Sequence, residues 1–321
     1  MADIREILQA SLQGKYDGFS YRVAEVPYHW TEDGLDVGGR FFYLTFQNGV
    51  ASLEEFVTLL YGQLVPYCIP RRIRDTKLAA MQSDGNWRHA AELLRKARDL
   101  FIRAGEDGRK ASEVGELILF TLLEAAFGAP QLVCKMALKT SEAMPIHGAD
   151  GIHVMPGRQH GSVCFVWGEA KLYKTLSSAL DAACTSIKGF VERAGRRAPI
   201  GREIDIIRDH LDTTMHPQLQ SFLLDALDPY TPVYNQREEA FACFVGFDYD
   251  IIQKIHKLPR QNRESAFLQA YGGRIQSACS LFAEKRRRAG LTDYQLHFLL
   301  LPFENVDALR TAFEQVLRGS P

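Results

Sequence analysis

The hexapeptide Gly168–Tyr173 places an acid, Glu169, and an amine, Lys171, two residues apart. It follows Val163–Trp167, a wholly apolar run that predicts a strand buried on both faces. Because side chains alternate along a strand, Glu169 and Lys171 are expected to point to the same side. A carboxylate and an amine held together where a core strand ends are costly unless they are paired or used in chemistry.

A second carboxylate, Asp150, lies just before a predicted hairpin. The hairpin consists of a strand, a turn and a second strand: Gly151–Met155, Pro156–Gly161 and Ser162–Leu172. With the turn centred near residues 158–159, antiparallel pairing puts Asp150 across from about position 167, and Glu169 is one same-face step further along. The hairpin is therefore expected to bring two carboxylates within reach of one cation.

Two carboxylates beside a lysine fit the metal-dependent hydrolysis of a phosphodiester. Carboxylates hold a hard cation such as Mg²⁺ or Mn²⁺, which activates water and neutralises charge on the phosphate. We therefore expect Asp150 and Glu169 to be metal ligands and Lys171 to lie beside the attacking water, where an amine can orient the nucleophile. Glu116, inside an apolar helix predicted over Ser112–Phe127, is expected to supply a further metal ligand or a contact to a water in the metal's shell.

The wider pattern predicts a mixed α/β chain. Around the hairpin we expect a strand at Gln131–Lys139, a helix at Leu176–Val191 and a core strand at Ala240–Phe247. The remaining predicted elements are a strand at Phe41–Phe46, helices at Ser52–Pro66, Trp87–Arg103, 201–228, Glu264–Arg288 and Val306–Leu317, and a strand at Tyr294–Phe303. We expect three regions: a mixed N-terminal region (1–109), a core (110–249) and a helix-strand-helix extension (250–321). Arg71–Arg74, after Pro70, is expected to be a solvated loop or a phosphate contact.

The candidate residues resemble a known motif. Asp150, then Glu169-x-Lys171, preceded by the helical Glu116, are similar to the PD-(D/E)xK nuclease superfamily. This resemblance implies a restriction-endonuclease-like core, an α-β-β-β-α-β mixed sheet, with added N- and C-terminal elements. Ala149 stands where that superfamily often has proline, a substitution that removes no ligand.

Three local strings carry a closer resemblance: Gly115–Leu117, His147–His153 and Gly168–Tyr173. They resemble the HamA family, the nuclease subunits of Hachiman anti-phage defence systems. The resemblance implies a deoxyribonuclease that degrades DNA when its helicase partner, HamB, senses altered or invading DNA. It also leaves open a homodimer of the nuclease once it is released.

Composition limits the remaining classes. The 321 residues carry a formal net charge of −1, so DNA contact has to come from local basic patches. The six cysteines include no C-x-x-C pair and are expected to be reduced thiols of a cytoplasmic protein. No signal-peptide pattern, membrane-spanning run, nucleophile elbow, P-loop or Rossmann glycine pattern occurs in the sequence.

Other interpretations stay open. The Asp150, Glu169 and Lys171 set is also consistent with a buried structural ion pair beside a turn aspartate. Glu116 could be a solvated helix residue, and His147 and His153 could bind a transition metal, donate a hydrogen bond to the site or lie at the surface. At the level of function, the alternatives are a catalytically silent docking subunit of a helicase complex and a stand-alone restriction or repair endonuclease.

Overall fold

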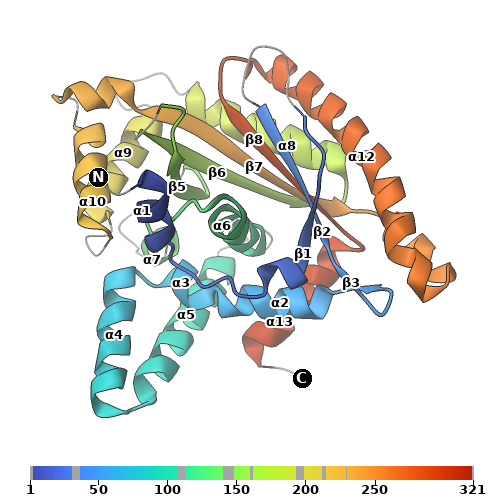
Figure 1. The fold of residues 1–321 in the computed structure, drawn as a ribbon, viewed down its shortest axis with the longest axis horizontal. Helices are drawn as coiled ribbons and strands as arrows, with labels where there is room; N and C mark the ends of the chain where they lie inside the picture. Colours follow the sequence, from blue (N-terminus) through green and yellow to red (C-terminus); the bar gives the residue numbers. More distant parts are fainter. Residues whose placement is uncertain are drawn as a thin grey trace. The chain divides into compact units, whose positions relative to one another are not determined.

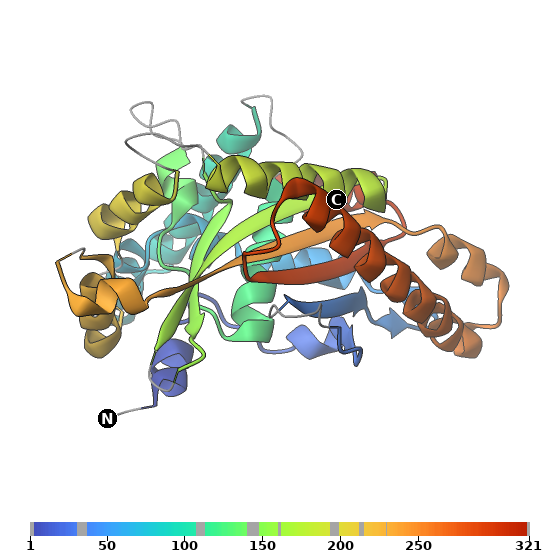
Figure 2. The ribbon, with the colours of Figure 1, turned by 90° about the horizontal axis from the view of Figure 1, so that it is seen from above.

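The computed structural model describes residues 3–30, 37–106, 113–139, 148–159, 162–192, 199–211, 215–228 and 230–319. It is a mixed α/β protein with a six-stranded sheet in the order β1-β2-β8-β7-β6-β5 (Figure 1). The strands are β1 Val23–Val26, β2 Val37–Leu44, β5 Gly151–Pro156, β6 Val163–Tyr173, β7 Glu238–Asp248 and β8 Leu296–Phe303. Pairs β1–β2 and β5–β6 are antiparallel, whereas β2–β8 and β7–β8 are parallel. Figure 2 shows β6, β7 and β8 side by side in green, orange and red.

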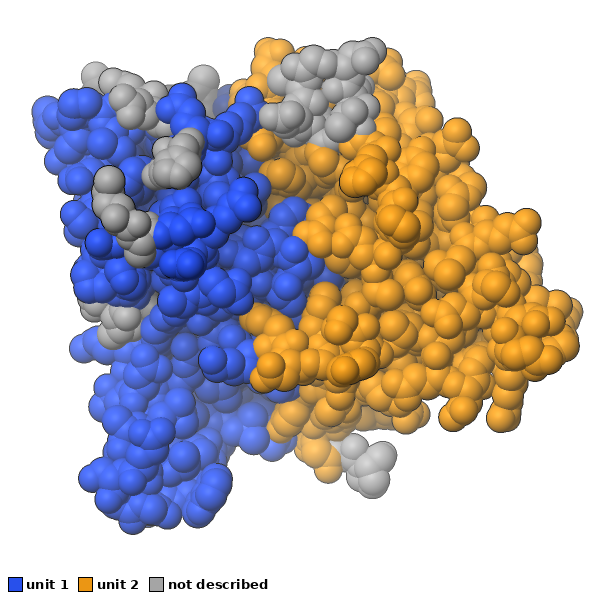
Figure 3. All heavy atoms as spheres, in the orientation of Figure 1, with its two compact units in different colours: residues 1–15, 62–168, 190–240 blue, residues 16–61, 169–189, 241–321 orange. Residues whose placement is uncertain are grey.

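The chain divides into two units, coloured in Figure 3. Unit 1 comprises residues 1–15, 62–168 and 190–240, and unit 2 comprises residues 16–61, 169–189 and 241–321. The boundary crosses β6 between Gly168 and Glu169, so one continuous strand contributes to both units.

Unit 1 is built around α6, whose residues are almost all buried. Its helices are α1 Ile4–Ala10, α3 Leu64–Cys68, α4 Arg71–Asp84, α5 Arg88–Glu106, α6 Glu113–Phe127, α7 Lys135–Lys139, α9 Pro199–His210 and α10 Pro217–Leu227. The apolar run Leu117–Leu123 explains the position of α6, because a helix that is apolar on nearly every face has to be covered on all sides. Helix α6 packs against β5.

Unit 2 has its core between the sheet and α12. The Tyr271 hydroxyl of α12 donates hydrogen bonds to the carbonyl oxygens of Phe42 (3.0 Å) and Leu300 (3.3 Å), which lie on β2 and β8. The other elements of this unit are the short strands β3 Phe46–Gln47 and β4 Val50–Ala51 and helices α2 Leu53–Gly62, α8 Leu176–Val191, α11 Ile251–Lys254, α12 Arg260–Ala289 and α13 Val306–Arg318. No described helix is long and apolar enough to cross a membrane.

Most of the strongly patterned segments were predicted correctly. The predicted helices at Trp87–Arg103, Ser112–Phe127, Leu176–Val191, Glu264–Arg288 and Val306–Leu317 are confirmed as α5, α6, α8, α12 and α13. The predicted strands at Ser162–Leu172, Ala240–Phe247 and Tyr294–Phe303 are confirmed as β6, β7 and β8. Each has either a clear helical stripe or a continuous apolar run, the two patterns that burial enforces.

The predicted strand at Gln131–Lys139 is wrong. Only Gln131 forms an isolated bridge, to His153, and Lys135–Lys139 form helix α7. Lysine, methionine, alanine and leucine, which make up α7, all favour helix, and Val133 is the only β-branched residue of the segment. Two strands, β5 and β6, therefore lie between α6 and α8, where three were expected.

The N-terminal half contains two further corrections. Pro66 was expected to end a long helix, but α2 ends at Gly62 and Pro66 lies within the separate short helix α3. The expected loop at Arg71–Arg74 is the first turn of α4. No residue of α4 is buried, so its sequence lacks the apolar stripe that would have revealed the helix.

Candidate functional site

The β5–β6 hairpin carries Asp150 at its open end. The observed register pairs Gly151 with Gly168 and Ile152 with Trp167, so the expected pairing of Asp150 with a residue near 167 is wrong by two positions. The reason is a turn centred one residue later than expected, because Pro156 pairs with Val163 and the Gly157 N–H donates to the Ser162 carbonyl at 2.8 Å. A shift of two positions keeps every side chain on the face that was expected.

The backbone of Asp150 forms a hydrogen bond at the open end of the hairpin. Its N–H donates to the carbonyl oxygen of Gly168 at 2.7 Å. That carbonyl belongs to the peptide bond that joins Gly168 to Glu169. Gly168 is also a point of close approach, because a Cβ there would lie 2.8 Å from Cδ2 of Leu119 on α6. A glycine at this position therefore lets α6, which carries Glu116, pack closely on the hairpin.

Glu116 is buried, with 4% of its surface exposed, and is held by Tyr67. The Tyr67 hydroxyl donates to Oε2 of Glu116 at 3.0 Å. Burial raises the pKa of Tyr67 well above its ordinary value, and the negative charges of Glu116 and Asp150 add to the effect. The hydroxyl therefore stays protonated as a donor, and both predicted carboxylates lie close enough to act on it electrostatically. The sequence offered no signal for Tyr67, which directly follows Pro66 in the short helix α3.

Glu169 and Lys171 form an ion pair between Oε1 and Nζ, as their shared strand face predicted. The side chains are 8% and 20% exposed, so the pair is largely shielded but reaches solvent through the lysine side chain. Cys243 of β7 lies near both groups, and burial is the main cause that raises the pKa of its thiol well above the ordinary value. The neighbouring thiol is therefore uncharged and adds no charge beside Glu169 and Lys171.

A buried ion pair fixes the residues just before Asp150. Lys135 of α7 donates to the carbonyl oxygen of Ala149 and pairs with Glu203 of α9 at 2.9 Å, with side-chain exposures of 2% and 1%. Gly148 lies directly beneath Glu203, since a Cβ on it would come within 1.7 Å of Oε1. This contact accounts for the glycine in the Gly148–Asp150 string. Burial raises the pKa of Glu203, whereas the nearby Lys135 acts in the opposite direction.

His153 is a fully buried structural residue. Its Nδ1 is 2.8 Å from the Ala129 carbonyl oxygen, to which it donates, and its ring packs near Phe120. Burial lowers the pKa of His153 to about 4, so the ring is neutral at neutral pH. The surface interpretation is therefore wrong for His153, and its hydrogen bond goes to a backbone carbonyl. His147 lies outside the described residues.

The candidate residues thus form two local groups. Glu116 and Asp150 lie together in unit 1 near Tyr67, and Glu169 and Lys171 form their pair in unit 2. Within the described part of the chain, no three or more histidine, cysteine or acidic side chains form a group that could hold a metal ion. A metal site built from these residues would therefore use few protein ligands.

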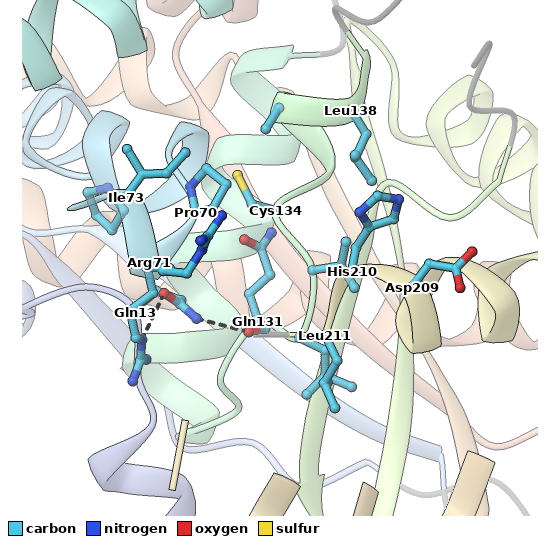
Figure 4. Close-up of a pocket in the computed structure, with 15 residues that line it drawn as sticks. Gln13, Pro70, Arg71, Ile73, Gln131, Cys134, Leu138, Asp209, His210 and Leu211 are labelled. Carbon is cyan, nitrogen blue, oxygen red and sulfur yellow. Dashed lines mark hydrogen bonds between the residues drawn. The ribbon is translucent and has the colours of Figure 1, made fainter. Parts of the chain in front are cut away.

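A separate cavity of about 400 Å³ in unit 1 includes none of the four candidate residues (Figure 4). Pro70, Leu138 and Leu211 supply part of its apolar wall. Arg71 also lines it, but its guanidinium donates to the Leu12 carbonyl at 2.9 Å and to Gln13 at 3.3 Å. The polar groups at this end of the cavity therefore bind one another.

The match to known families covers nearly the whole chain. The model of the family described as HamA matches residues 21–317. The chain belongs to the HamA family. Neither a curated protein nor a solved structure matches the sequence. Membership of the HamA family makes the chain a component of a Hachiman anti-phage defence system, and all four candidate residues lie within the matched segment.

Proposed function

We propose that this HamA-family protein is the nuclease effector of its defence system, a metal-dependent deoxyribonuclease that acts with a helicase subunit, HamB. The observation that carries the proposal is the shielded ion pair of Glu169 and Lys171. Glu169 directly follows Gly168, whose carbonyl oxygen accepts the backbone hydrogen bond of Asp150. The Lys171 side chain is partly exposed, so a phosphodiester in solvent can reach it while Glu169 stays shielded beside it.

We propose that the fold contains a reduced PD-(D/E)xK core. Helix α6, the β5–β6 hairpin, α8 and β7 would correspond to the helix, the hairpin and the following helix and strand of that core, with α7 inserted before β5 and with α9 and α10 inserted before β7. The single bridge from Gln131 to His153 of β5 would be the remnant of the first expected strand.

The donor set fits magnesium or manganese. Mg²⁺ in enzymes is commonly held by one or two carboxylates, while water and substrate phosphates complete its shell. Asp150 and Glu169 would hold the ion, and Glu116 would support it as a further ligand or through a water. When bound, the ion supplies Lewis-acid activation and neutralises charge on the phosphate. The hard oxygen donors argue against a zinc-type site, which is usually built from histidine and cysteine.

The protein's own groups have separate tasks. Lys171 would move from its pair with Glu169 to orient the attacking water and contact the phosphate, where an amine stabilises negative charge. Tyr67 holds Glu116 by a hydrogen bond and keeps its proton because of burial. Lys135 and Glu203 fix the backbone at Ala149 and therefore the start of the Asp150 segment.

The decisive experiment incubates the purified protein with Mg²⁺ and plasmid DNA, alone and with its helicase. We expect DNA loss that EDTA abolishes and that Glu169→Ala or Lys171→Ala reduces at least 100-fold, in line with the loss of a charge-stabilising group. The matched controls are Glu314→Ala and Arg318→Ala, which remove an exposed ion pair of α13 (2.9 Å) and should leave activity unchanged.

Two outcomes would decide against the proposal. Undiminished DNA loss in both the Glu169 and the Lys171 variants would exclude this site as the source of cleavage. An inactive wild-type protein, both alone and with a helicase engaged on DNA, would favour a catalytically silent docking subunit. Helicase-independent cleavage abolished by the same variants would instead indicate a stand-alone endonuclease.

A further inference from the structure

Helices α4 and α5 form a hairpin (Figure 1). Its sequence has an excess of positive charge. Between Arg71 and Glu106 the sequence contains nine lysines and arginines but only five acids, in a chain whose formal net charge is −1. In Figure 3 this hairpin is the lobe at the lower left of unit 1. The local excess of positive charge is the kind of patch that a nearly neutral protein needs in order to bind a polyanion.

Four of the five lysines and arginines of α5 lie on one exposed face. Leu93, Ala97 and Phe101 form its buried stripe. The opposite face carries Arg88, Arg95, Lys96 and Arg103, whose spacings of seven, one and seven residues bring them onto one side of a helix. From Arg88 to Arg103 the helix rises about 22 Å, roughly the length of six nucleotides of one DNA strand at about 3.4 Å each.

Three of these cations are available for a ligand. Arg95, Lys96 and Arg103 are exposed, and no ion pair involves them within the described residues. Arg88 and Lys77 share Glu92 at 3.0 and 2.8 Å, so they neutralise one acid of the hairpin. Asp99 is the remaining acid on this face and leaves it with a net positive charge.

An aromatic side chain stands at the tip of the hairpin. Trp87 is 77% exposed and lies in the turn between the two helices. The turn itself is well ordered by hydrogen bonds, since Asp84 accepts the Asn86 N–H at 2.8 Å and Asn86 accepts the Arg88 N–H at 3.0 Å. All residues from 82 to 88 are exposed, so the indole has no apolar neighbours within the turn. Packing within the protein does not explain a tryptophan at this place.

We propose that the α4–α5 hairpin binds single-stranded DNA, with Arg95, Lys96 and Arg103 on the phosphates and Trp87 stacked on an unpaired base. A basic groove or ridge combined with an exposed aromatic ring is the usual chemistry of single-strand binding, because every base offers a π-face. An acidic protein surface is the alternative ligand for these charges and is one outcome of the test. The inference rests on the proposed nuclease function and names the surface that brings single-stranded DNA to it.

The test measures binding of a fluorescein-labelled oligothymidine by anisotropy in EDTA, so that no cleavage is involved. Arg95→Gln, Lys96→Gln and Arg103→Gln combined should make the slope of log affinity against log salt less steep by about 2, at roughly 0.7 per neutralised phosphate. Trp87→Ala should lower the affinity roughly 5- to 100-fold. The tryptophan fluorescence of the wild type should be quenched by the oligonucleotide, and most of this quenching should be absent in Trp87→Phe.

The matched control replaces three exposed cations outside the hairpin, Lys15, Lys257 and Arg260, by glutamine and should keep the wild-type slope. A wild-type slope and affinity in the hairpin variants would overturn the inference. So would unchanged DNA binding combined with loss of helicase co-purification, which would make the hairpin a protein-docking surface. Loss of binding in the hairpin variants, with cleavage unaffected by Glu169 and Lys171 substitutions, would uphold the hairpin and reject the nuclease site.

Discussion

The backbone N–H of Asp150 donates to the carbonyl oxygen of Gly168 at 2.7 Å, in the peptide bond that leads into Glu169. Two carboxylates that are nineteen positions apart in the chain are therefore linked by one hydrogen bond and one covalent step. The bond ends a hairpin ladder that runs from the Gly151–Gly168 pair to the Pro156–Val163 pair. Changes to this ladder or to α6 above it should act on the candidate site even when they touch no carboxylate.

Gly168→Ala tests the close packing of α6 on the hairpin. The added methyl group would lie 2.8 Å from Cδ2 of Leu119. Overpacking of this kind typically costs about 1–3 kcal/mol of unfolding free energy. We expect that loss in chemical denaturation, together with reduced DNA cleavage, because α6 carries Glu116.

The partner change is Leu119→Ala, which removes the atom that the new methyl group meets. In that background Gly168→Ala should cost less, with a coupling energy of about 0.5–3 kcal/mol between the two positions. Strictly additive free energies would show that the Leu119–Gly168 contact does not control the packing of α6.

The sequence predicted the Glu169–Lys171 ion pair correctly but not the register of the strand beside it. Glu169 and Lys171 were predicted on one strand face because strand periodicity is strict, and their ion pair follows directly. The register at Asp150 was wrong by two positions because it depended on where the turn is centred, which side-chain periodicity does not encode. Whether these residues hold a metal and cleave DNA stays a prediction.

Lys135 and Glu203, which fix the backbone before Asp150, could not be found from the sequence. Lys135 was assigned to a strand that does not exist, and its partner Glu203 lies more than sixty residues away. Their meeting at the Ala149 carbonyl depends on tertiary packing, which local propensity does not determine. Helix α4 was missed for a related reason, since a helix without buried residues leaves no periodic signal.

Lys135→Met tests the buried ion pair. It leaves Glu203 as a buried charge without its amine and removes the donor to the Ala149 carbonyl. Breaking such a pair typically costs about 3–5 kcal/mol. We expect a loss of this size in denaturant unfolding, and lower DNA cleavage at saturating Mg²⁺ because the Asp150 segment is less well held.

The double variant Lys135→Met with Glu203→Met separates charge from contact. It removes both buried charges, so part of the stability should return while the Ala149 carbonyl still lacks its donor. Equal losses in the single and the double variant would mean that the uncompensated charge is not the cause.

His153 should make stability depend on pH. Burial lowers its pKa to about 4 in the folded protein, whereas an unfolded chain binds the proton near the ordinary value of about 6.5. The stabilisation is therefore complete above pH 6.5 and is lost as the pH falls towards 4. The loss amounts to about 3 kcal/mol at about 1.4 kcal/mol for each unit of the shift.

The measurement is urea unfolding between pH 4 and 7. His153→Asn retains an amide donor for the Ala129 carbonyl but does not titrate, so this part of the pH dependence should disappear. His210→Gln, a change at an exposed histidine, should leave the dependence intact. An unchanged pH profile in His153→Asn would assign the effect to other groups.

Tyr67→Phe should affect both stability and cleavage. The substitution removes the hydroxyl that donates to the buried Glu116 carboxylate at 3.0 Å. A buried group that loses a partner costs about 1–3 kcal/mol. Because Glu116 then lacks the hydrogen bond that holds it, DNA cleavage at saturating Mg²⁺ should also fall.

Tyr271→Phe is the matched control, because its buried hydroxyl donates only to backbone carbonyls among the described contacts, at 3.0 and 3.3 Å. It should lower stability by a similar amount and leave cleavage at saturating Mg²⁺ unchanged. Equal cleavage rates for the two variants would remove Glu116 from the site.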